Sequence, residues 1–158
     1  YRKVESIPYR FKLIYRASRD GNKVAKFHEK CDNKGATIVI TKVTNSNHII
    51  GGYNPFQWDL SNSWKSTNDS FIFSFTDRTN LQSAKVGYKN NNDKCSMDCH
   101  SEIGPAFGIG YDLCCRNDGT WLSYNPYSYY KIDIPLLNQN NRFNIDDYEV
   151  FQVIIKYK

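Results

Sequence analysis

The residues of this chain with the most distinctive chemistry are its five cysteines and three histidines. His28 and Cys31 lie three positions apart, so a helix would place them on one face. An imidazole beside a thiol favours the thiolate, the reactive form of cysteine. Val24 and Phe27 share this helical spacing, however, and such a stripe is typical of the core-facing side of an amphipathic helix. We therefore favour packing over catalysis for this pair.

A second group, Cys95, Cys99 and His100, has the residue types that bind zinc. A structural zinc ion needs four ligands, usually in two pairs, and neither the adjacent Cys114 and Cys115 nor the helical pair has suitable spacing to complete the set. We expect no metal and no other cofactor. The odd number of cysteines is typical of reduced thiols in the cytoplasm, because a secreted disulfide framework uses even numbers.

Phosphate binding and acid–base chemistry have weaker signals. Residues 104–110 are rich in glycine, but they lack the Gly-Lys-Ser/Thr ending of a phosphate loop and precede a predicted strand, so we interpret them as a turn. Asp112 lies in apolar surroundings, and Asp146, Asp147 and Glu149 are close in sequence. Two such carboxylates could form an acid–base pair if the fold brought them together, whereas capping of turns is their default role.

Aromatic residues make up 15% of the chain, which favours β-structure because these side chains fit a pleated, half-buried surface. The tyrosines and the tryptophan of residues 121–130 could stack on sugars, as in a lectin. Tyrosine is equally common at protein interfaces, so both uses stay open.

The elements that must position these residues are mostly strands. Alternating or β-branched apolar patterns predict about eight of them, and residues 90–102 are interpreted as a surface loop or a poor hairpin. One helix is expected, capped by Ser18 or Asp20 and ended by Asn33 or Gly35. The clearest strand predictions are residues 10–16, 36–43, 48–53, 70–75, 83–89, the end of 104–115, and 149–158, with an edge strand around Pro135.

The composition fits one globular domain spanning residues 1–158. The net charge of +5 comes from scattered basic residues, which indicates a solvated surface more than nucleic-acid binding. No segment approaches the roughly 20 apolar residues of a membrane span, and the N-terminus lacks the apolar core of a signal peptide. Because the chain begins at Tyr1 instead of Met, we expect that it was excised from a longer protein.

Several segments, in order along nearly the whole chain, resemble the TLDc domain of the oxidation-resistance proteins. The similarity is greatest to the fungal and amoebal branch, where this domain often follows a BTB domain. The matching segments are FKLIYRASRDG (11–21), FHEKCDNKGATIVITKV (27–43), IIGGYNPFQW (49–58), DSFIFSF (69–75), GPAFGIGYDL (104–113) and DYEVFQV (147–153).

The resemblance implies a mostly β (α+β) fold in which two antiparallel sheets pack as a sandwich, with one clear helix and a few short flanking helices. It also implies a role in protection against oxidative stress and binding to subunits of the vacuolar proton pump. It supplies no catalytic residue. The positions that carry the family signature, for which we expect structural roles, are Arg16, Asp20, Gly51, Gly52, Tyr53, Trp58, Asp112 and Glu149.

The leading hypothesis is therefore a non-catalytic protein-interaction domain in the cytoplasm, attached to other domains. Its binding surface is expected on the loop from Asn54 to Trp64 and on the glycine-rich turn, through Phe56, Trp58 and Phe107, because irregular segments with exposed aromatics often carry recognition. The alternatives are a thiol-dependent antioxidant enzyme and a lectin-like, carbohydrate-binding sandwich.

Overall fold

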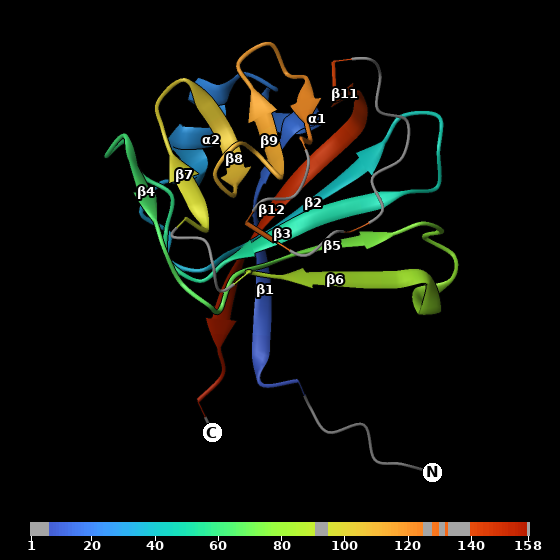
Figure 1. The fold of residues 1–158 in the computed structure, drawn as a ribbon. Helices are drawn as coiled ribbons and strands as arrows, with labels where there is room; N and C mark the ends of the chain where they lie inside the picture. The colour runs from blue at the N-terminus through green and yellow to red at the C-terminus, as the bar shows by residue number, and fades with distance from the viewer. Residues whose placement is uncertain (1–6, 91–94, 125–127, 130–131, 133–139, 158) are drawn as a thin grey trace.

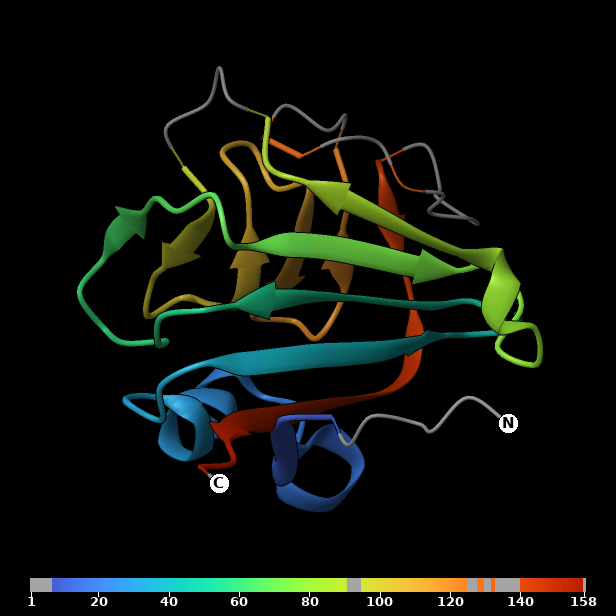
Figure 2. The same cartoon turned by 90° about the horizontal axis from the view of Figure 1, so that it is seen from below.

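Within the residues that the structure describes, the strands form two antiparallel sheets of six strands each (Figure 1). The computed structural model describes residues 7–90, 95–124, 128, 129, 132 and 140–157. The first sheet has the order β1-β12-β2-β3-β5-β6 and the second β11-β10-β9-β8-β7-β4. Figure 2 views the molecule from the first sheet, whose strands lie in front of those of the second. The predicted β-sandwich is thus confirmed.

The elements follow one another along the chain as β1 (Tyr9–Arg16), α1 (Ala17–Asp20), α2 (Val24–Cys31), β2 (Thr37–Val43), β3 (Ile49–Asn54), β4 (Ser63–Lys65), β5 (Phe71–Phe75), the 3₁₀ turn η1 (Leu81–Ser83), β6 (Ala84–Tyr88), β7 (Met97–Cys99), β8 (Ile103–Phe107), β9 (Leu113–Arg116), β10 (Trp121–Leu122), β11 (Arg142–Phe143) and β12 (Ile145–Ile155).

Strand β2 shows how the sequence gives the first sheet a core face. Every second residue from Thr37 to Val43 is buried, and the residues between them are partly exposed. This period of two is the pattern of a strand with one face on the core. The predicted strands at residues 36–43 and 48–53 are confirmed, and β2 and β3 pair antiparallel as a hairpin.

Gly51 and Gly52, for which structural roles were expected, mark close approaches on opposite faces of β3. A Cβ atom on Gly51 would lie 1.9 Å from the Val39 carbonyl oxygen, and one on Gly52 would lie 2.6 Å from the Phe107 ring. A side chain at either position would therefore collide with its neighbours. Glycine at position 52 allows the second sheet to approach, and glycine at position 51 relieves contacts within the first sheet.

Aromatic rings fill the space between the sheets. Trp58 packs edge-on against Phe27 and Phe107, with centroid distances of 5.8 and 5.6 Å. Tyr148 meets Tyr15 at 5.0 Å and Trp121 at 5.2 Å. Aromatic pairs in edge-to-face geometry, which all of these except the tilted Tyr15–Tyr148 pair adopt, stabilise by about 0.5–1.5 kcal/mol beyond the burial of their area.

The described part of the chain has two short α-helices where the sequence predicted one. Gly21 separates them, and its φ of 99° lies outside the helical range. The predicted N-terminal cap of the amphipathic helix is therefore wrong. Ser18 and Asp20 lie within α1, and α2 begins after Lys23 without a side-chain cap. The predicted C-terminal signal is confirmed, since Asn33 follows α2 with a φ of 59°.

Residues 95–107 differ most from the prediction. The expected surface loop contains the buried strand β7, and the expected turn at Gly104 is the buried strand β8. A shift in register between Ile103 and Ala106 accommodates Pro105 within β8, since proline cannot donate to a ladder. The edge strand predicted around Pro135 lies outside the described residues.

Candidate functional site

The segment of residues 54–65, which runs from the end of β3 through strand β4 and is called the 54–65 loop below, crosses from the first sheet to the edge of the second (Figure 1). It begins with a turn in which the buried Asn54 accepts a hydrogen bond at Oδ1 from the Phe56 backbone N–H, 2.9 Å away. An asparagine that bonds two residues on is a common way to start a turn. The loop is therefore anchored where it leaves the sheet.

Trp58 is the central anchor of the loop. Its side chain is 1% exposed, and its indole Nε1–H donates to Thr37 Oγ1 at 2.9 Å. Its carbonyl oxygen accepts from the Asn33 N–H at 2.9 Å, just after α2. The exposure expected for Trp58 is thus wrong. The same holds for Phe107, which is 0% exposed, because both rings fill the space between the sheets.

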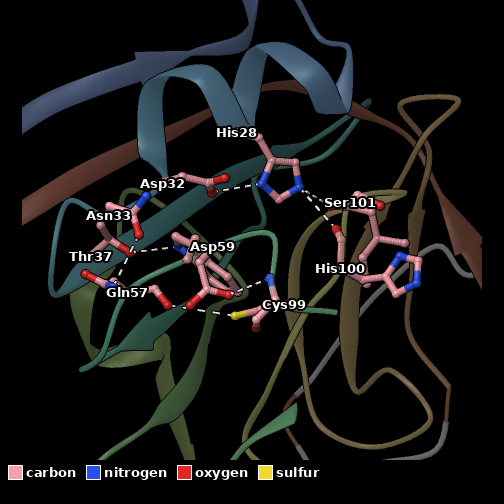
Figure 3. Close-up of polar contacts among 12 residues, drawn as sticks. His28, Asp32, Asn33, Thr37, Gln57, Asp59, Cys99, His100 and Ser101 are labelled. Carbon is pink, nitrogen blue, oxygen red and sulfur yellow. Dashed lines mark hydrogen bonds and ion pairs between the residues drawn. The ribbon is translucent and has the colours of Figure 1, made fainter. Parts of the chain in front are cut away.

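A polar network ties the loop to β4 and to the residues after α2 (Figure 3). Lys65 Nζ donates to the Gln57 carbonyl oxygen at 2.7 Å and to the Asp59 carboxylate, while Gln57 Nε2 donates to Asn33 Oδ1 at 3.3 Å. Burial opposes ionisation of Asp59, but the Lys65 ammonium and the Ser61 donors outweigh it and lower its pKa. These bonds hold the loop backbone from both sides.

His28 fastens α2 to the β7–β8 turn beside this network (Figure 3). Its Nδ1 lies 2.8 Å from Asp32 Oδ1, and its Nε2 lies 3.1 and 2.9 Å from the carbonyl oxygens of His100 and Ile103. Because carbonyl oxygens only accept, Nε2 carries a proton. Both ring nitrogens are therefore engaged away from Cys31, which leaves the imidazole unable to activate that thiol.

Three apolar side chains of this segment are exposed. Phe56 is 44% exposed, Leu60 58% and Trp64 64%. An open groove of about 700 Å³ lies beside Phe56. Its walls come from the loop and from neighbouring segments, namely Gly35, Pro55, Phe56, Gln57, Lys65 and Ser66. The loop thus presents aromatic side chains on a backbone that is held in place.

Asp98, beneath Trp64, is a polar residue that the sequence analysis missed. It pairs with Trp64 across β4 and β7 and is only 7% exposed. Burial raises its pKa, and hydrogen bonds from the Trp64 and Tyr111 side chains partly oppose that rise. The alternation of apolar and polar residues in Met97-Asp98-Cys99 could have indicated a strand at this position, because successive side chains of a strand point to opposite faces and the middle residue then points away from the core.

The thiols do not have the environment of a reactive site. All five cysteines are buried, at 1% exposure or less. Burial raises the pKa of the Cys31, Cys99 and Cys114 thiols, and raises that of Cys115 to about 12. The thiolate is the nucleophile and reactive thiols are accessible, so the features that the antioxidant-enzyme hypothesis requires are not found at these positions.

The aromatic segment suggested for sugar binding is also turned inward where the structure describes it. Trp121 is 0% and Tyr129 2% exposed, whereas Tyr124 is 41% exposed. Tyr129 OH donates to the Ser96 carbonyl oxygen at 2.7 Å. Tyr127 and Tyr130 lie outside the described residues.

The charged signature residues form a cluster where β1 meets α1 and β12. Arg16 NH2 lies 2.8 Å from Glu149 Oε2, and the Arg16 backbone N–H donates to Asp20 Oδ2 at 2.9 Å. The hydrogen bonds from Arg19 are the main cause that lowers the pKa of Asp20 to about 2. These contacts join a strand to the start of a helix.

The remaining signature residues lie elsewhere. Asp112 is 1% exposed, and its Oδ2 accepts from the Tyr129 backbone N–H at 2.9 Å. Tyr53 lies on the outer face of the first sheet, with its ring 5.3 Å from that of Phe71. Among the described residues the signature positions therefore do not converge on one cavity.

The acidic residues considered for acid–base catalysis are separately engaged. Asp146 pairs with Lys42 at 2.6 Å, and Asp147 accepts from Ser18. Across the described ranges no group of three side chains able to hold a metal ion is found. No described helix has the length and apolar character needed to span a membrane.

Comparison with known proteins agrees with the fold. The family model of the TLDc domain matches residues 3–154, nearly the whole chain. No curated protein matches the sequence. The matched range includes both sheets, the 54–65 loop and the charged cluster. The chain therefore belongs to the TLDc domain family.

Proposed function

We propose that this TLDc domain is a non-catalytic protein-interaction domain of the cytoplasm that contributes to protection against oxidative stress by binding subunits of the vacuolar proton pump. The partner and the process come from the family resemblance of the sequence. The structure contributes a surface suited to binding.

The observation that carries the proposal is the 54–65 loop, where exposed Phe56, Leu60 and Trp64 stand on a fixed backbone. Large aromatic side chains supply much of the binding energy at protein interfaces. A loop already held by Trp58 and Lys65 loses little conformational entropy on binding, so more of the contact energy remains as affinity. The loop is therefore our proposed contact with the partner.

The enzymatic alternative is less well supported because of the burial of all five thiols. The lectin alternative loses two of its stacking residues, Trp121 and Tyr129, to the core. A cytoplasmic location agrees with five free cysteines, which persist most readily in a reducing compartment.

Affinity capture with this chain as bait tests the proposal. Wild-type chain should enrich proton-pump subunits from a cell lysate, and the Phe56→Ala/Trp64→Ala variant should enrich them much less. Leu81→Ala is the matched control, since Leu81 is 76% exposed and lies outside the loop. Equal capture by the loop variant would contradict the assignment of the surface, and lack of pump subunits with the wild type would contradict the partner.

A further inference from the structure

The outer face of the first sheet is turned away from the second sheet (Figure 2), and most of its positions carry apolar residues. The strand register assigns its residues, because paired residues point to the same side of a sheet. Core residues such as Val39, Ile50 and Ile72 define the inner side. The apolar outer positions are Tyr9, Phe11, Leu13, Ile38, Ile40, Ile49, Tyr53, Phe71, Phe73, Phe75, Val86, Tyr88, Phe151, Val153 and Ile155.

Many of these side chains are open to solvent although they are large. Phe11 is 50%, Tyr88 58% and Ile155 56% exposed. Rings on β3, β5 and β6 contact one another, with centroids 5.3 Å apart for Tyr53 and Phe71 and 6.1 Å for Phe71 and Tyr88. The face therefore carries contacting rings on β3, β5 and β6 and further apolar side chains on the other three strands.

Charged side chains occupy the outer positions at one end only, among the residues that the structure describes. Arg16 and Glu149 at that end form an ion pair. Lys42 and Asp147 lie opposite each other on β2 and β12 at the same end. A partner that covers the rest of the face would bury no charge. Burial of an unpaired charge is costly, so this distribution favours an apolar partner.

The size of the face indicates what kind of partner would cover it. With about 200 Å² for each large side chain, the exposed fractions of Tyr9, Phe11, Val86, Tyr88 and Ile155 amount to about 500 Å². The half-buried apolar side chains between them bring the face above the roughly 300–600 Å² of the largest patch on a typical monomer. A standard interface buries about 800 Å² on each partner. The area is therefore sufficient for a stable dimer.

The shape points to another sheet. Six strands about 4.8 Å apart span roughly 24 Å, whereas one helix, about 10 Å across, would cover some two strands. Sheets pack face to face about 10 Å apart through side chains that interdigitate. A second sheet of the same width, with the same apolar face, would cover the surface apart from its charged end.

We propose that two copies of this chain form a two-fold symmetric dimer through the outer faces of their first sheets. A two-fold axis along the strand direction at the centre of the sheet keeps the charged ends of both copies, with their own Arg16–Glu149 pairs, at the polar rim of the interface. This inference is independent of the proposed function, because it uses residues outside the 54–65 loop.

Sedimentation velocity on the whole chain, from about 1 to 100 μM, tests the dimer, since interfaces of this size commonly give micromolar or tighter affinity. Wild-type chain should sediment as a dimer at the upper concentrations. Phe11→Lys and Tyr88→Lys each place a charge at a half-exposed outer position and should raise the dimer dissociation constant at least about tenfold. Circular dichroism confirms that each variant is folded.

The control is Trp64→Lys, which changes an exposed aromatic residue on β4 of the second sheet and should leave the dimer intact. A wild-type chain that stays monomeric at 100 μM would overturn the proposal. A dimer that resists both Phe11→Lys and Tyr88→Lys would also overturn it, because another surface would then hold the copies together. Either result leaves the capture experiment with the loop variants unaffected.

Discussion

Replacement of Gly52 by alanine tests the packing at the centre of the sandwich. A Cβ atom there would lie 2.6 and 2.8 Å from atoms of the Phe107 ring, whereas carbon atoms in contact are about 3.5–4.0 Å apart. The ring or the strand must therefore move by about 1 Å. Phe107 has little room to move, because Trp58 and Tyr129 pack edge-on against it at 5.6 and 6.5 Å.

The expected cost follows from these distances. Overpacking of a core costs about 1–3 kcal/mol, and the reduced backbone freedom of alanine in the unfolded chain returns roughly 0.5–1 kcal/mol. We expect Gly52→Ala to lower the free energy of unfolding by about 1–2 kcal/mol. The measurement is urea denaturation followed by tryptophan fluorescence.

A double-mutant cycle with Phe107→Leu isolates the collision. Phe107→Leu alone leaves a cavity and destabilises the chain, but it also makes room for the alanine methyl group. The double variant should therefore be more stable than the sum of the single effects predicts, by at least about 1 kcal/mol. A loss below about 0.5 kcal/mol for Gly52→Ala, or additivity within about 0.3–0.5 kcal/mol, would refute the reasoning.

Three other predictions follow from the site. Thiol reagents at neutral pH should label none of the five cysteines in the native chain and all of them in urea, since every thiol is buried; rapid native labelling of any one would contradict this. The pKa of Asp20 is lowered to about 2. Its ionised carboxylate therefore contributes its whole stabilisation above the unfolded pKa of roughly 3.9, and this contribution is lost as the pH falls towards 2. Denaturation curves of Asp20→Asn and wild type should differ at pH 7 and coincide near pH 2. Glu149→Gln should cost less than about 1 kcal/mol and less in high salt, because both partners of its pair with Arg16 are partly exposed; a salt-independent loss of several kcal/mol would argue against a surface pair.

The sequence patterns predicted the fold well where local signals and burial agree. The β-branched run of β2, the Gly51-Gly52 approach and the apolar stripe of α2 all depend on residue type and period, which are read directly from the chain. The two sheets follow from these short strands with few helices between them. The family resemblance over nearly the whole chain pointed to the same sandwich.

The errors occurred where tertiary contacts decide the outcome. Trp58 and Phe107 lie beside turn-forming residues, and their local sequence does not reveal that the two rings meet between the sheets at 5.6 Å. Strand β7 contains Asp98 and follows a polar segment, so its local polarity concealed a buried strand. Its burial depends on pairing with β4 and β8, which are distant or irregular in the sequence.

The candidate site was predicted in part. The loop from Asn54 to Trp64 was named from its aromatic residues, and Phe56 is exposed as expected. The bonds that fix the loop were not foreseeable, because Lys65, Asp59 and Asn33 meet only after β4 joins the second sheet. The apolar outer face was concealed for a similar reason: a strand with apolar residues on both sides is the same in sequence whether one face or both are covered.

The most direct test of the central claim, that this domain acts by binding through the 54–65 loop, is a titration of the immobilised chain with the purified peripheral sector of the vacuolar proton pump. We predict saturable binding with a dissociation constant of about 10 μM or lower, and an increase of at least about fivefold for Trp64→Ala, as expected for an aromatic anchor. Lack of saturable binding up to about 100 μM, or equal affinity of the wild type and Trp64→Ala, would contradict the claim.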